Sequence, residues 1–162
     1  MTPTPPPEQA APGAADHPAR RWTPVALGAD ADGTPLPPPK GAYSPAVRAG
    51  DFVFVSGQVP RDPRTGDLVG DGDVAAQTRQ TLVNLRRVLD AAGATLADVV
   101  SVAVHLAHAD DWAAFDAVYR ETFAAPFPTR TVVGAELRGI LVEITAVAYA
   151  PAATVGRPAE GA

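Results

Sequence analysis

Apolar residues recur at three- and four-residue steps between positions 74 and 92, and this pattern predicts an amphipathic helix. The apolar stripe consists of Val74, Thr78, Leu82, Leu85, Leu89 and Ala92. Asp73 precedes the stripe as an N-cap residue, and Gly93 follows it as a helix terminator. A helix with one apolar face must bury that face against another layer, so the rest of the chain has to supply one.

A second helical pattern follows Asp110 and Asp111, either of which can cap it. Its apolar positions are Trp112, Phe115, Val118, Tyr119 and Phe123. Pro126 and Pro128 prevent the helix from continuing.

Segments rich in β-forming residues surround the two helices. We expect a hairpin from strands 46–48 and 51–59, then strands at 101–107, 129–135 and 140–148, with a possible short first strand at 22–27. The order β-β-α-β-α-β-β predicts a single α+β domain with both helices on one face of a sheet. The other face then needs cover, and the simplest candidate is a second copy of the chain.

The prolines are unevenly distributed, with 11 of 18 in the first 40 residues. Such a segment buries too little apolar surface to offset the entropy lost on ordering. We therefore expect a disordered Pro- and Ala-rich extension at 1–40, a folded domain at 41–150 and a flexible tail at 151–162.

The charge and residue content exclude several classes of function. A net charge of −5 argues against nucleic acid as a partner, because phosphate binding requires a concentrated basic surface. The absence of cysteine excludes disulfides, Cys-ligated zinc and thiol nucleophiles. No apolar segment is long enough for a signal peptide or a membrane span, so a cytoplasmic protein without a membrane partner is expected.

A metal site is not expected. His105 and His108 lie close in sequence, but residues three apart on a strand point to opposite faces, so the two rings would not converge on one ion.

Five short segments together carry a family resemblance over about residues 41–149. They are Gly41-Ala42-Tyr43-Ser44, Val55-Ser56-Gly57-Gln58-Val59, Asp116-Ala117-Val118-Tyr119, Phe127-Pro128-Thr129-Arg130-Thr131 and Val142-Glu143-Ile144. In this order and at these separations, the set resembles the RidA (YjgF) family.

The resemblance implies a chorismate-mutase-like fold, a homotrimer whose sheets form an inner barrel, and clefts at the subunit interfaces. It also implies hydrolysis of small enamines and imines, such as 2-aminoacrylate and 2-iminopropanoate, to 2-keto acids and ammonia, without a cofactor. The carboxylate-binding arginine of the family matches Arg130, and the water-holding glutamate matches Glu143. Tyr43 and Ser56 match the tyrosine and serine of the cleft.

The residue types are compatible with these roles, although an exposed arginine, a solvent-facing glutamate or a glycine in a turn would also fit the sequence alone. The planar guanidinium of Arg130 can bind a carboxylate through paired donors. Glu143 stands among apolar residues, and strand alternation turns it away from them, so it could position a water or be an ordinary solvent-facing strand residue. Ser56 lacks an accompanying base, so we assign it hydrogen bonding, and Gly57 would allow close approach of a ligand. Tyr43 could close the cleft or act only in packing.

Asp116 departs from the asparagine found in many deaminating members of the family. An ionised carboxylate near a ligand carboxylate would repel it, so Asp116 in the cleft could instead select a ligand with a donor or a cation. Two alternatives to a small-imine deaminase therefore stay open. One is a related enzyme that hydrolyses, cyclises or condenses a larger substrate, and the other is a non-catalytic trimer that binds small carboxylates or partner proteins.

Overall fold

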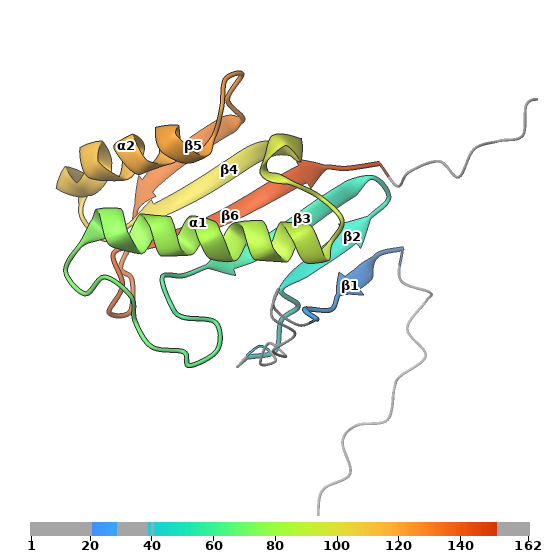
Figure 1. Ribbon diagram of the computed structural model, residues 1–162, viewed down its shortest axis with the longest axis horizontal. Coiled ribbons are helices and arrows are strands. Elements are labelled where there is room, and N and C mark those ends of the chain that lie inside the picture. The colour runs from blue at the N-terminus through green and yellow to red at the C-terminus, as the bar shows by residue number, and fades with distance from the viewer. Residues whose placement is uncertain (1–20, 29–38, 40, 152–162) are drawn as a thin grey trace, which may run out of the picture.

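The computed structural model describes residues 21–28, 39 and 41–151. Within them, six strands form one mixed sheet, and both α-helices cover the same face of it (Figure 1). This arrangement confirms the predicted α+β class and the predicted order of elements. The expectations for residues 1–20, 29–38, 40 and 152–162 fall outside the described residues.

The sheet is built largely from antiparallel pairs. Its strands are β1 (Thr23–Val25), β2 (Ala46–Ala49), β3 (Phe52–Gln58), β4 (Val99–Leu106), β5 (Thr129–Gly134) and β6 (Val142–Tyr149). They lie in the order β1-β2-β3-β6-β4-β5, and only β4 and β5 pair in parallel. β5 is therefore an edge strand, next to β4, and β4 is followed by β6.

Helix α1 (Val74–Ala91) begins and ends as predicted. The Asp73 carboxylate accepts a hydrogen bond from the amide of Ala76 at 3.0 Å, and Gly93 terminates the helix with a φ of +70°. The buried face is wider than the apolar stripe, because Gln77 and Asn84 are buried as well. Both amides are hydrogen-bonded to neighbouring segments, which explains how polar residues can lie there.

Helix α2 (Trp112–Thr122) starts after a 3₁₀ turn at Ala109–Asp111. Asp111 occupies the N-cap position, but its side chain caps no amide, so the predicted side-chain cap is wrong for this residue. The physical reason is its helical backbone, with φ −74° and ψ −8°, whereas a capping side chain requires an extended residue.

The core lies between the helices and the sheet. Its fully buried side chains include Leu85 and Leu89 from α1, Phe115 from α2, and Val104, Val142 and Ile144 from the central strands. None of the described helices is long and apolar enough to cross a membrane.

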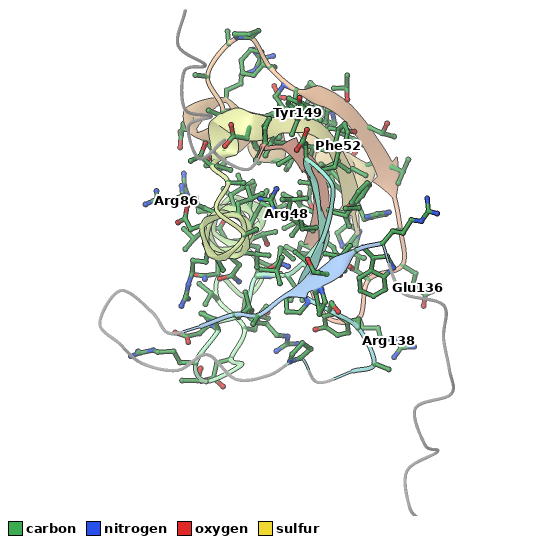
Figure 2. All side chains as sticks on the ribbon, turned by 90° about the vertical axis from the view of Figure 1, so that its right-hand side faces the viewer. Arg48, Phe52, Arg86, Glu136, Arg138 and Tyr149 are labelled. Atoms are coloured by element: carbon green, nitrogen blue, oxygen red, sulfur yellow. The ribbon has the colours of Figure 1, made fainter. Side chains whose placement is uncertain are left out.

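The helix-free face of the sheet exposes large apolar side chains. Phe52, Phe54 and Tyr149 each remain more than 40% exposed, as does Val133. The Phe52 and Tyr149 rings lie side by side at the end of the sheet, with centroids 5.3 Å apart (Figure 2). Single exposed apolar residues are common on protein surfaces, but a cluster of aromatic rings is typical of an interaction surface.

Candidate active site

The predicted site residues lie in two groups on opposite faces of the sheet. Arg130 pairs in register with the core residue Val102, so its side chain points toward helix α2. Glu143 alternates with the buried Val142 and Ile144, so its side chain points to the helix-free face. A single chain therefore does not bring Arg130 and Glu143 together.

The first group is a charge cluster between β5 and α2. Nη1 of Arg130 lies 2.8 Å from Oδ1 of Asp116, and Nε of Arg120 lies 2.7 Å from Oδ2 of the same carboxylate. The Asp116 side chain is only 10% exposed, so one nearly buried carboxylate bridges two guanidinium groups. Asp116 does lie beside Arg130, which answers the question raised by its departure from asparagine.

Aromatic rings also contact the Arg130 guanidinium. Its Cζ lies 4.5 Å from the centroid of the Tyr119 ring and 5.5 Å from that of Phe115. Contacts of this kind fix the plane of a guanidinium and add cation–π attraction. Arg130 also borders a cavity of about 270 Å³, together with Asp116, Tyr119, Arg120, Phe127 and Pro128.

The electrostatics of this cluster favour an anion. The Arg120 and Arg130 guanidinium groups lower the pKa of the Asp116 carboxyl, which therefore stays ionised at neutral pH. The three side chains keep one net positive charge, enough to balance one ligand carboxylate. Burial raises the pKa of the Tyr119 hydroxyl, which has no hydrogen-bond partner within the described residues.

The second group is centred on Glu143 and Gly57. The Glu143 carboxylate lies directly against Gly57, and a Cβ atom at position 57 would collide with it. Gly57 therefore makes room for the Glu143 carboxylate, and close approach of a ligand to Gly57 stays a prediction. Both residues belong to neighbouring strands, β6 and β3, whose register shifts between Val55 and Gln58.

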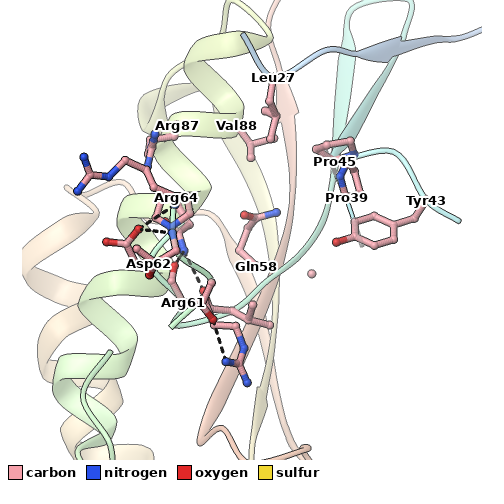
Figure 3. Close-up of a pocket in the computed structure, with 16 residues that line it drawn as sticks. Leu27, Pro39, Tyr43, Pro45, Gln58, Arg61, Asp62, Arg64, Arg87 and Val88 are labelled. Atoms are coloured by element: carbon pink, nitrogen blue, oxygen red, sulfur yellow. Dashed lines mark hydrogen bonds between the residues drawn. The ribbon is translucent and has the colours of Figure 1, made fainter. Parts of the chain in front are cut away.

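Ser56 connects the end of β3 to the segment that carries Tyr43. Its hydroxyl donates a hydrogen bond to the Ser44 carbonyl at 2.7 Å, and its amide donates to the Pro45 carbonyl at 3.0 Å. Tyr43 is 56% exposed. It lies with Gly57 on the wall of a cavity of about 480 Å³, which extends toward α1 (Figure 3).

Sequence reasoning missed two of the neighbours of these groups. Arg120 lies four residues after Asp116 on a helix, a spacing that by itself predicts an ion pair. His105 faces Glu143 across the β4–β6 pairing, which only the strand register reveals. No group of three or more His, Cys, Asp or Glu residues in the described part of the chain could hold a metal ion.

Comparisons with known proteins agree on one family. Residues 34–150 match the family described as Endoribonuclease L-PSP. The chain is 44% identical to a RutC family protein of Pyrococcus horikoshii, over 70% of this chain and 90% of that protein. It is 39% identical to a Dermatophagoides farinae protein named 2-iminobutanoate/2-iminopropanoate deaminase, over 70% and 91%. The solved structure of RidA from an Antarctic Psychrobacter matches with a TM-score of 0.66 at 34% identity, over 70% of this chain and 93% of that one.

Proposed function

The chain belongs to the RidA/YjgF/L-PSP (RutC) family, and we propose that it is an enamine/imine deaminase that hydrolyses small 2-imino acids to 2-keto acids and ammonia. The observation that carries this proposal is the Arg130 guanidinium, oriented by Asp116 and Tyr119 beside a cavity. Its remaining donors suit the carboxylate that every 2-imino acid carries. The deaminase name of one relative supports the reaction class.

The site is a cleft between two copies of the chain. Arg130 and Asp116 of one copy would face Glu143, Gly57 and Tyr43 of the next, because these groups lie on opposite faces of a single sheet. The exposed rings on the helix-free face supply the apolar surface for such contacts. A homotrimer closes this head-to-tail arrangement and provides three equivalent clefts.

The chemistry requires orientation and proton transfer. Arg130 holds the substrate carboxylate, and Glu143 accepts a proton from a water molecule as its oxygen bonds to the imine carbon. The C=N π electrons move to nitrogen, which takes up a proton from solvent and gives a neutral carbinolamine. Glu143 then returns its proton to the nitrogen, the C–N bond breaks as the hydroxyl loses its proton to solvent and forms the C=O bond, and ammonia and the 2-keto acid are released. Every electron pair stays within substrate and water, so no redox partner takes part.

The direct experiment generates 2-aminoacrylate with a serine or threonine dehydratase and follows keto-acid release. We expect the wild-type protein to accelerate release, and Arg130→Ala to lower that acceleration about a hundredfold at substrate concentrations below KM. Equal rates with and without the wild-type protein would remove the deaminase proposal. Ligand binding without turnover of any imine would support the non-catalytic alternative.

The family description also mentions a ribonuclease. The net charge of −5 disfavours this activity, since RNA binding requires a basic surface. Incubating one preparation with RNA and with 2-aminoacrylate compares the two activities directly, and we expect no cleavage of the RNA.

A further inference from the structure

We infer that the cavity of about 480 Å³ beside Tyr43 and Gly57 binds the side chain of the substrate, and that this side chain is an apolar stem ending in a carboxylate. The inference rests on the proposed deaminase function and names its substrate class. The preferred substrates would thus be 2-imino acids with a second, distal acid group, rather than the smallest members of the class.

The acidic end of the stem is inferred from the charges around the cavity. Arg61, Arg64 and Arg87 line it, and Asp62 is the one acidic residue among its described lining residues. These four side chains carry two net positive charges in a chain whose total charge is −5. A local excess of arginines in an acidic protein favours an anionic ligand group.

Hydrogen bonds hold the loop that carries two of these arginines. The Asn84 side chain of α1 donates to the carbonyls of Val59 and Arg61, at 2.9 and 2.8 Å. The Asp62 carboxylate accepts from the backbone amides of Arg64 and Thr65, at 2.8 and 3.2 Å. These bonds lower the pKa of Asp62 and occupy one of its oxygens within the loop. The loop that carries Arg61 and Arg64 is therefore a defined turn.

The apolar stem is inferred from the cavity walls. Leu27, Val59 and Val88 line the cavity, and Pro39 and Pro45 line it beside Tyr43. In Figure 3, Tyr43 and the two prolines stand on one side, and Arg64 and Arg87 on the side of α1. A pocket of this size with mostly apolar walls and a few charged groups is typical of a small-molecule site.

The cavity lies next to the proposed reacting centre, so we assign it to the side chain of the substrate and not to a separate effector molecule. Gly57 lines the cavity and also contacts the Glu143 carboxylate, which would activate the water. Gly57 is the next-to-last residue of β3, so a substrate whose imine carbon lies at Glu143 would extend its side chain around this end of the sheet, past Tyr43, toward the arginines.

The test compares two imines of equal chain length, generated in situ by an amino-acid oxidase. One is 2-iminoadipate, which ends in a carboxylate, and the other is 2-iminohexanoate, which ends in a methyl group. We expect a higher kcat/KM for 2-iminoadipate. Arg64→Gln should lower that value about fivefold, as expected for a partly exposed charge pair, and leave 2-iminohexanoate unchanged.

Arg86→Gln is the matched control, because Arg86 lies on the same helix as Arg87 and pairs with Asp90, outside the cavity. It should change neither substrate. Equal kcat/KM values for the two imines, or a preference that survives Arg64→Gln, would overturn the inference while leaving the deaminase function in place.

Stable keto acids separate this inference from the proposed function. If the protein hydrolyses no imine, calorimetry with 2-oxoadipate and 2-oxohexanoate still tests the cavity. Tighter binding of 2-oxoadipate that is lost in Arg64→Gln supports the site, and equal binding of both keto acids rejects it.

Discussion

Asp116 and Arg130 join helix α2 to the edge strand β5, with Oδ1 of the carboxylate 2.8 Å from Nη1 of the guanidinium. Asp116 binds Arg120 with its other oxygen, so its charge is already balanced inside the protein. The repulsion that a free carboxylate would exert on an anionic ligand is thereby offset. Asp116 in place of asparagine is compatible with a carboxylate substrate because Arg120 accompanies it.

The first prediction concerns Arg130. Arg130→Lys keeps the charge but loses the paired planar donors, so we expect KM for a 2-imino acid to rise about tenfold. Arg130→Ala should raise it about a hundredfold, within the range for lost charge-assisted hydrogen bonds. Steady-state kinetics measures both.

A second variant separates binding from folding. Arg130→Ala leaves Asp116 with Arg120 alone, so part of its effect is on stability. Asp116→Asn added to Arg130→Ala should recover stability in urea without lowering KM. Recovery of KM would mean that Arg130 acts on the fold and not on the ligand.

The second prediction concerns pH. The two arginines lower the pKa of Asp116 in the folded protein, so its ionised form stabilises the fold above the unfolded pKa of about 3.9. That stabilisation is lost as the pH falls through the lower, folded pKa. Urea unfolding between pH 2 and 7 should show a smaller loss of stability for Asp116→Asn than for the wild type.

The control is the difference between the two proteins in free energy of unfolding at each pH. Because both proteins contain Asp62, whose pKa is also lowered, this difference removes the contribution of Asp62. Parallel curves would show that the Asp116 ion pairs contribute nothing to stability.

The sequence predicted the helices and the strands, but not how the candidate site residues meet. Local spacing is enough to pair Asp116 with Arg120, because a helix brings residues four apart together. The contact between Gly57 and Glu143 joins strands far apart in sequence and depends on a register shift after Val55. No local pattern encodes that register, so only the folded sheet reveals the contact.

The third prediction concerns Glu143 and Gly57. Glu143→Gln removes the proton acceptor, so we expect kcat to fall about a hundredfold with little change in KM. Gly57→Ala places a methyl group where the Glu143 carboxylate lies, so kcat should fall as well.

Because both variants act through one carboxylate, the double variant should be no slower than Glu143→Gln alone. A kcat in the double variant that is clearly lower than that of Glu143→Gln would contradict this expectation. Thermal unfolding of each protein checks that the alanine has not simply unfolded the chain.

The last prediction tests whether each site contains residues from two copies. Arg130→Ala and Glu143→Gln should each keep only about a hundredth of wild-type activity at substrate concentrations below KM, because every cleft then lacks one essential group. A hybrid cleft can combine Arg130 from one variant with Glu143 from the other. Random reassembly of an equal mixture places the intact pair in about a quarter of the clefts, so about a quarter of wild-type activity should return.

Phe54→Arg provides the control, since it places a charge on the exposed helix-free face that the copies would share. We expect it to dissociate the assembly in analytical ultracentrifugation and to abolish activity without changing Arg130 or Glu143.

In the mixing experiment, Arg130→Ala and Glu143→Gln are unfolded and refolded together so that their subunits exchange. Samples that are refolded separately and mixed afterwards give the baseline activity. If the mixture stays inactive while hybrids form, Arg130 and Glu143 do not act in one cleft, and the composite site is wrong.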